Sequence, residues 1–466
     1  MTARDGLDPG ARLARRHADL LVQGGTVLTP GGAERIDVAC VEGCIVALGD
    51  LQGIWSADTV LDATGLHVLP GVIDSQVHLR EPGLTHKENL EAGTRGAVLG
   101  GVTAVFEMPN TSPLTLTPSD LQAKLDAAHG RAWCDHAFYI GGSTVNAEQL
   151  AELENLPGCA GVKVFMGSSF GDLLADGDEV LRRILRHGRR RMAVHAEDEA
   201  RLRERKAIVE ASGDVCQHHV WRDVGSALMA TQRIVRLASE TGRRLHILHI
   251  SSAEEITFLA GHKHRVSVEV TPHHLTLHAP DCYERLDSLA QMNPPVREQH
   301  HQDALWQGIR NGVVDVIGSD HAPHTLHEKA RPYPQSPSGM TGVQTLLPLM
   351  LDHVHAGRLS LQRLVDLTSV GPARIFGTEG KGRIALGYDA DFSIVDLRAR
   401  RTIRNDWIAS VSGWTPYDGV SVTGWPIHTI VRGHAAVRDE ALTDTPPQGQ
   451  PLRFLETAPP SPFPES

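Results

Sequence analysis

The feature that most constrains the fold is an alternation of short apolar segments with helix-like segments through the middle of the chain. The helix-like segments, such as LQAKLDAAH and SALMATQRIVRLASETG, place apolar residues at roughly helical spacing. Eight apolar segments between them have the length and flanking turns of strands: residues 71–76, 103–107, 134–140, 161–165, 192–195, 245–249, 266–270 and 313–317. Eight strands alternating with helices over about 300 residues predict an α/β fold of the (β/α)8 TIM-barrel type.

Short β-like segments flank this middle region at both chain ends. They predict a small β-sandwich domain assembled from residues 18–69 and 375–440, beside a catalytic barrel over residues 70–374. Residues 1–17 are expected to form a loose lead-in, and the Pro-rich residues 441–466 a poorly ordered tail.

Composition excludes several classes of partner. Lys and Arg total 45 against 56 for Asp and Glu, and this net charge of -11 disfavours nucleic acid and anionic membranes. No stretch approaches the length of a transmembrane helix. The six cysteines are scattered without a CxxC pair, which is typical of a reducing compartment. We therefore expect a cytoplasmic protein.

Five potential metal ligands fall at the ends of five different predicted strands. They are His78, Lys163, His195, His249 and Asp320, and in a parallel barrel the carboxyl ends of all strands meet on one face. Imidazole and carboxylate groups suit zinc or a similar divalent ion. The pattern therefore predicts a metal site on that face.

Lys163 has two interpretations, because a charged lysine inside an apolar strand is costly to bury. Its ammonium group could extend to the strand end and reach water. Alternatively, its neutral amine could capture carbon dioxide and form a carbamate that bridges two metal ions.

Taken together, the strand-end segments resemble the amidohydrolase superfamily, and within it the cyclic amidohydrolases. The resemblance extends from about residue 20 to residue 433 and rests on PGVIDSQVHLREPG, GGVTAVFEMPNT, VKVFMGSS, AVHAED, HILHISS, EVTPHHL, MNPPVR, GSDHAPH and GKGRIALGYDADFSIVDL. It implies a metal-containing (β/α)8 barrel with a β-sandwich built from both chain ends. The metal would be one or two Zn²⁺ ions held by the five strand-end residues.

Within this group the chain is most similar to the dihydroorotase family, whose first strand ends in HxHLRE. Similarity implies that Arg80, Asn110 and His324 bind a substrate carboxylate, and that Asn293 lies near the substrate ring. A guanidinium with two neutral hydrogen-bonding groups suits a carboxylate. Allantoinases and hydantoinases differ at the position of Arg80.

One position departs from the family pattern Asp-x-His-x-His, because Gln76 stands where the first histidine is expected. An amide oxygen is a weak zinc ligand compared with an imidazole nitrogen. Three states stay open: a binuclear enzyme with Gln76 as a poor ligand, a mononuclear enzyme, or a protein that has lost catalysis.

The resemblance implies reversible, metal-dependent ring closure of N-carbamoyl-L-aspartate to dihydroorotate in de novo pyrimidine biosynthesis. Asp320 would move the proton between the attacking water and the leaving amide nitrogen. An allantoinase or hydantoinase is the alternative within the family. A catalytically silent partner of another pyrimidine-pathway enzyme is the alternative of a different class, and a homodimer is also compatible with the sequence.

Two further expectations concern the surroundings of the site. Residues 336–345 combine Pro, Gly and Ser, so they form either a flap over the site or an ordinary surface connection. The histidine pairs His218-His219 and His300-His301 lie in polar contexts and are expected to be exposed to solvent.

Overall fold

The computed structural model describes residues 16–167 and 171–456, and its central element is an eight-stranded sheet. All neighbouring strands are parallel and follow one another in chain order: β8 (Val72–Val77), β9 (Val102–Glu107), β10 (Asp135–Gly141), β11 (Cys159–Phe165), β12 (Met192–His195), β13 (Leu245–Ile247), β14 (Val266–Val270) and β15 (Val316–Ile317). The sheet nearly closes, because the His78 amide donates to the His321 carbonyl at 2.7 Å between the first and last strands. The predicted (β/α)8 barrel is confirmed.

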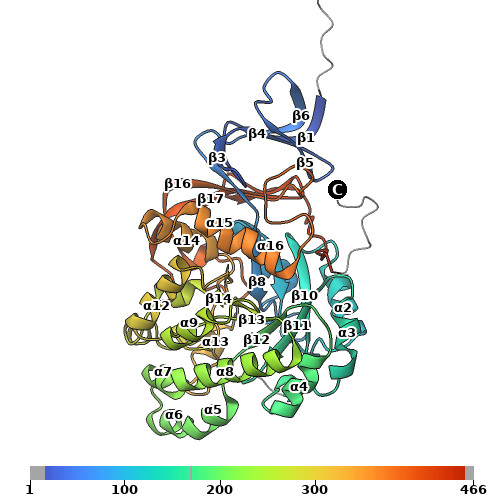
Figure 1. The fold of residues 1–466 in the computed structure, drawn as a ribbon. Helices are drawn as coiled ribbons and strands as arrows, with labels where there is room; N and C mark the ends of the chain where they lie inside the picture. The colour runs from blue at the N-terminus through green and yellow to red at the C-terminus, as the bar shows by residue number, and fades with distance from the viewer. Residues whose placement is uncertain (1–15, 168–170, 457–466) are drawn as a thin grey trace, which may run out of the picture.

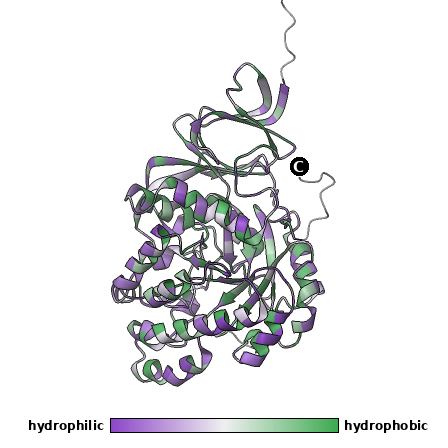
Figure 2. Ribbon diagram, viewed as in Figure 1, coloured by the Kyte–Doolittle hydropathy of each residue, from purple (hydrophilic) through white to green (hydrophobic). Residues whose placement is uncertain are grey.

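Helices between the strands cover the outside of the barrel, as Figure 1 shows. The main ones are α1 (Leu90–Leu99), α2 (Pro118–Ala128), α4 (Asp178–Arg186), α8 (Val224–Thr241), α9 (Ala253–Ala260), α12 (Gln299–Arg310) and α14 (Leu346–His355). Several begin at capping side chains: Asp223 accepts from an amide of α8, and Thr117 forms a capping box with Asp120. Apolar and polar residues alternate along these helices (Figure 2), so one face of each packs on the strands.

An aromatic cluster fills the barrel interior beneath the strand ends. Phe106 lies at its centre, with ring centroids 5.1 Å from Phe376, 5.9 Å from Phe454 and 6.2 Å from Tyr139. Small residues such as Ala160 and Ala193 make room for these rings. This packed layer fills the barrel below the carboxyl ends of the strands, the face where barrel enzymes place their active sites.

Two further sheets lie together beyond one end of the barrel (Figure 1), and the larger of them combines strands from both ends of the chain. The smaller sheet has the order β5 (Cys44–Gly49), β4 (Asp37–Val41), β1 (Arg16–Gln23) and β6 (Trp55–Asp62). The larger one has the order β19 (Ala441–Leu442), β18 (His434–Arg438), β17 (Ser421–Val431), β16 (Phe392–Thr402), β7 (His67–Pro70), β2 (Thr26–Thr29) and β3 (Gly32–Arg35). The predicted small β domain from both chain ends is confirmed, while its limits at residues 70 and 374 stay a prediction.

The two ends of the chain are described in part. Strand β1 begins at Arg16, inside the expected lead-in, and residues 1–15 and 457–466 lie outside the described residues. Within the expected tail, Leu452 and Phe454 are buried, and the Leu452 amide donates to the His136 carbonyl at 2.8 Å. In the described ranges, none of the helices combines the length and the apolar character that crossing a membrane would require.

Candidate active site

A cavity of about 230 Å³ opens at the carboxyl ends of the barrel strands. It brings together all ten residues expected at the site: Gln76, His78, Arg80, Asn110, Lys163, His195, His249, Asn293, Asp320 and His324. Phe165, Met292 and Ala322 complete the wall with residues 337–339. The convergence follows from the parallel barrel, because each strand delivers its last residues to the same face.

Three of these residues have strained backbones. Arg80, His249 and Asp320 adopt φ angles of 61°, 38° and 47°, in the left-handed region that side chains other than glycine disfavour. Each such conformation costs on the order of 1–3 kcal/mol and is retained only where surrounding contacts impose it. At these three positions the strain lies where the strands leave the barrel and the side chains turn into the cavity.

His195 and His249 form a pair of imidazoles at the cavity. His195 Nδ1 lies 2.9 Å from His249 Nε2, and His195 Nε2 lies 2.8 Å from the Glu197 carboxylate. Since a carboxylate only accepts, the His195 proton is assigned to Nε2, which leaves the Nδ1 lone pair facing the cavity.

Glu197 supports His195 and was not among the residues predicted from the sequence. Burial alone would raise the pKa of Glu197, but the adjoining Arg222 guanidinium and His195 hold it well below its ordinary value. A permanently charged acceptor therefore fixes the ring orientation of His195. The only sequence signal was its place two residues after His195 in AVHAED.

Lys163 is buried rather than extended to water, with 1% of its surface exposed. Its Nζ lies 4.3 Å from the centroid of the Phe165 ring. Burial lowers the pKa of Lys163 to about 7, so a large share of the amine is neutral near neutral pH. Reaction with carbon dioxide requires the neutral amine, and carbamylation of Lys163 stays a prediction.

Asp320 is the acceptor in a chain of polar contacts along one side of the cavity. Its Oδ1 accepts from Gln76 Nε2 at 2.9 Å and lies 3.2 Å from His78 Nε2. The other ring nitrogen of His78 lies 2.8 Å from Asn110 Oδ1. Residues from the first, second and eighth strand ends are thus joined in one network.

Arg80 makes one end of the cavity cationic, and His324 lies beside it. Arg80 Nη2 lies 3.3 Å from His324 Nε2, and Arg80 Nε donates to the Pro323 carbonyl at 3.2 Å. Lys87 Nζ lies 3.1 Å from the other ring nitrogen of His324. Burial, followed by the charges of Arg80 and Lys87, lowers the pKa of His324 and keeps its ring neutral. Lys87 was not predicted from the sequence, since an isolated lysine in a loop has no distinctive pattern.

Asn293 is oriented by a histidine that was expected to be exposed. His218 Nε2 lies 3.2 Å from Asn293 Oδ1, while His218 Nδ1 lies 2.9 Å from the Tyr333 hydroxyl. The expectation of exposure is wrong for both His218 and His301, which are buried. Their polar sequence neighbours face other directions, and tertiary packing buries these two rings.

The segment 336–345 contributes directly to the cavity through Pro337, Ser338 and Gly339. The buried Lys329 ammonium donates to the Pro337 carbonyl at 2.8 Å and to the Gly339 carbonyl at 3.0 Å. These bonds fasten the segment to the wall of the site.

The architecture and this cavity agree with the comparison to known protein families. The model of the amidohydrolase family matches residues 67–436, which span the barrel and the strands β7, β16 and β17 of the larger sheet. The chain belongs to the amidohydrolase family.

Its relatives within that family differ in substrate. A dihydroorotase of Methanosarcina mazei is 36% identical over 434 residues, covering 90% of this chain and 94% of that protein. An allantoinase of Salmonella gallinarum is 34% identical over 448 residues, covering 93% and 98%. The solved L-hydantoinase (dihydropyrimidinase) from Arthrobacter aurescens has a TM-score of 0.89 at 29% identity, covering 93% of this chain and 99% of that one.

The donor atoms at the cavity fit the metal ion that membership of the amidohydrolase family implies. Two imidazole nitrogens, of His195 and His249, face each other 2.9 Å apart, and His249 Nδ1 is buried with no hydrogen-bond partner. Lys163 and Asp320 line the same cavity. Nitrogen and carboxylate donors of this kind suit zinc.

A cluster of three buried aspartates outside this cavity does not offer a metal site. Oxygen atoms of Asp135, Asp389 and Asp391 lie within 4.8 Å of one another. The Lys381 ammonium forms ion pairs with all three carboxylates, and Arg432 pairs with Asp135 and Asp389. The protein's own cations occupy the space that an ion would need.

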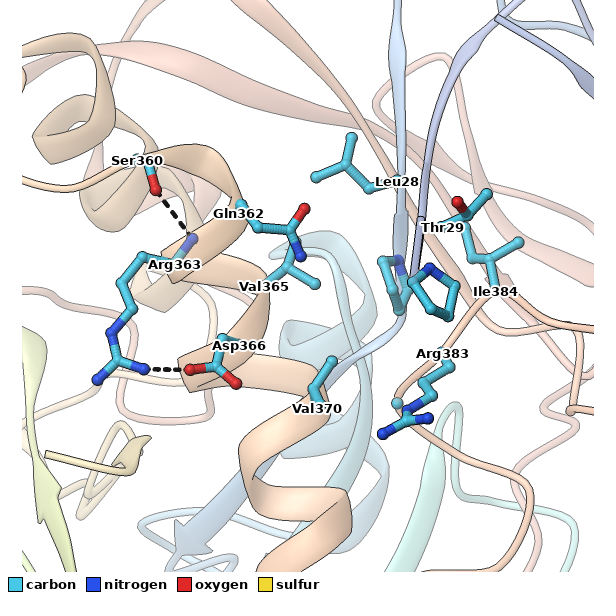
Figure 3. Close-up of a pocket in the computed structure, with 13 residues that line it drawn as sticks. Leu28, Thr29, Ser360, Gln362, Arg363, Val365, Asp366, Val370, Arg383 and Ile384 are labelled. Atoms are coloured by element: carbon cyan, nitrogen blue, oxygen red, sulfur yellow. Dashed lines mark hydrogen bonds and ion pairs between the residues drawn. The ribbon is translucent and has the colours of Figure 1, made fainter. Parts of the chain in front are cut away.

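A larger cavity of about 450 Å³ lies between the small domain and the end of the barrel (Figure 3). Apolar residues such as Leu28, Val365 and Ile384 form much of its wall. One of its two arginines, Arg363, is paired with Asp366. The residues that line it include no histidine or other converging ligand set, so the strand-end cavity is the candidate active site.

Proposed function

We propose that this amidohydrolase is a dihydroorotase, which interconverts dihydroorotate and N-carbamoyl-L-aspartate in pyrimidine biosynthesis. The observation that carries the proposal is that Arg80 is buried and has no direct ion-pair partner among the described residues. The residue is 7% exposed, and no carboxylate among the described residues forms an ion pair with its guanidinium. A buried, unpaired guanidinium is costly, and a substrate carboxylate beside it would offset that cost.

The alternative substrates lack the carboxylate that would pair with Arg80. Allantoin and hydantoin carry no carboxylate, so their binding would leave the buried Arg80 without a direct ion pair. Allantoinase activity is the second candidate function, since the allantoinase relatives match the chain at 34% identity.

The protein's own groups have separate roles in the proposed reaction. Arg80, Asn110 and His324 would hold the substrate carboxylate, and Asn293 would contact the ring. Asp320 would take a proton from the attacking water and return it to the leaving amide nitrogen, acting as a positioned acid and base. Fixing the substrate at one end places its reacting amide beside Asp320.

Lys163, His195 and His249 would hold a Zn²⁺ ion, with His78 and Asp320 beside them. When bound, such an ion supplies Lewis acidity towards the ring carbonyl and acidifies water. We propose a cytoplasmic location, in keeping with the composition and the substrate.

The proposal is tested by comparing three substrates on the purified, zinc-loaded chain. Dihydroorotate, allantoin and hydantoin are supplied at equal concentration and ring opening is followed for each. We expect turnover of dihydroorotate and little of the other two. Faster turnover of allantoin or hydantoin would transfer the assignment to that activity. Bound metal with no turnover of any of them would favour a silent partner.

A further inference from the structure

We infer that this amidohydrolase holds a single metal ion, bound by Lys163, His195 and His249, and that the Gln76 amide takes the place of a second ion. The inference rests on the proposed metal-dependent function. It concerns the number and location of ions, so it can be tested without reference to the substrate.

The orientation of Gln76 is fixed by its partner. Gln76 Nε2 donates to Asp320 Oδ1 at 2.9 Å, and the side chain is 2% exposed. Turning the amide over would place its oxygen against a carboxylate oxygen, and both atoms are acceptors. The group directed at Asp320 is therefore an N–H group, which has no lone pair to offer a cation.

The remaining atom of the Gln76 amide is a poor substitute for an imidazole. Its Oε1 is buried without a hydrogen-bond partner. A neutral amide oxygen is a hard donor that suits magnesium or calcium better than zinc.

Asp320 and His78, the other ligands on this side, are already linked to each other and to neighbours. Asp320 Oδ1 lies 3.2 Å from His78 Nε2, and His78 Nδ1 lies 2.8 Å from Asn110 Oδ1. Together with Gln76 these groups form a continuous polar chain. Within it, the Gln76 amide gives Asp320 Oδ1 a hydrogen bond from the protein, in place of the contact that an ion would otherwise make.

On the opposite side of the cavity, no described residue takes the place of an ion in this way. His195 Nδ1 and His249 Nε2 face each other at 2.9 Å. Two nitrogens bound to one tetrahedral zinc ion lie roughly 3.3 Å apart, so a small movement of either ring would admit the ion. Glu197 holds the far nitrogen of His195, as carboxylates commonly do for zinc-bound histidines. Lys163, which lines the same cavity, would be the third donor.

The test is the number of zinc ions per chain, measured by elemental analysis after chelation, reloading with excess zinc and removal of free metal. We expect about one ion in the natural chain and about two in Gln76→His, which supplies the missing imidazole. Gln76→Glu is a second variant that adds an anionic ligand, so the result does not depend on the fit of one ring. His249→Ala should lose the ion, whereas His264→Ala, which removes an exposed histidine, should keep it.

Two ions in the natural chain would overturn the inference. So would a single ion that survives His249→Ala but is lost in His78→Ala, or a chain that binds none. Failure of the proposed function is a separate result, because a chain with one ion that does not open dihydroorotate would leave the ion count intact and reject only the activity.

Discussion

At the scale of single residues, the site depends on backbone conformations that the chain must be forced to adopt. Asp320, with φ of 47°, illustrates this, because the strained turn after β15 directs its carboxylate to Gln76 and His78. Aspartate and asparagine tolerate the left-handed region better than most residues. Replacing Asp320 by asparagine therefore tests its chemistry while preserving its geometry.

We predict that Asp320→Asn lowers kcat for dihydroorotate by about 10²–10⁴-fold, because an amide cannot relay the proton. Zinc content should stay at the natural level, since the ion is held by other residues. Steady-state kinetics and elemental analysis on the same preparation measure both quantities. Near-natural kcat in this variant would exclude Asp320 as the acid-base group.

At the scale of elements, the barrel strands and the residues at their ends were predictable from the sequence. Apolar runs followed by His, Lys or Asp produce a local signal, and each such residue lies at the cavity. Supporting residues such as Glu197, Lys87 and His218 were not predictable. Their roles come from contacts between segments far apart in the chain, which leave no periodic pattern.

Strand β14 carries a buried carboxyl group that should make stability depend on pH. Glu269 accepts from Ser75 Oγ at 2.8 Å, and burial raises its pKa to about 8. The folded chain therefore keeps this proton at pH values where the unfolded chain has released it. The stability it contributes is present below the unfolded pKa and is lost as the pH rises through about 8.

We predict that Glu269→Gln, which imitates the protonated form, reduces the fall in Tm between about pH 6 and about pH 9. Thermal unfolding monitored by circular dichroism at both pH values measures this fall. Glu284→Gln is the matched control, since Glu284 is exposed on α11 (Asp281–Leu286). An equal fall in the natural chain and in Glu269→Gln would show that Glu269 is ionised throughout.

At the scale of the whole molecule, a buried ionic network ties the small domain to the barrel. Lys381 pairs with Asp135 at the start of β10 and with Asp389 and Asp391, which precede β16 in the larger sheet. Arg432, directly after β17, pairs with two of these carboxylates, Asp135 and Asp389. Removing one member of such a network leaves buried charges without compensation.

We predict that Lys381→Met destabilises the protein by about 3–5 kcal/mol, measured as a lower midpoint of denaturant unfolding. Adding Asp391→Asn should recover part of the loss by removing one of the unpaired charges. Lys206→Met, at a half-exposed lysine, should change stability by less than about 0.5 kcal/mol. Stability unchanged in Lys381→Met would mean that the network does not hold the two parts together.

The central claim is that the site selects a ring bearing a carboxylate through Arg80. The most direct test is kcat/KM for dihydroorotate and for dihydrouracil, the same ring without the carboxylate, in the natural chain and in Arg80→Met. A hydrogen bond to a charged group is worth about 1.5–3 kcal/mol, so we predict a loss of about 10–150-fold for dihydroorotate only. Arg398→Met, at an exposed arginine, should change neither value. An equal loss for both substrates, or a natural preference for dihydrouracil, would contradict the account.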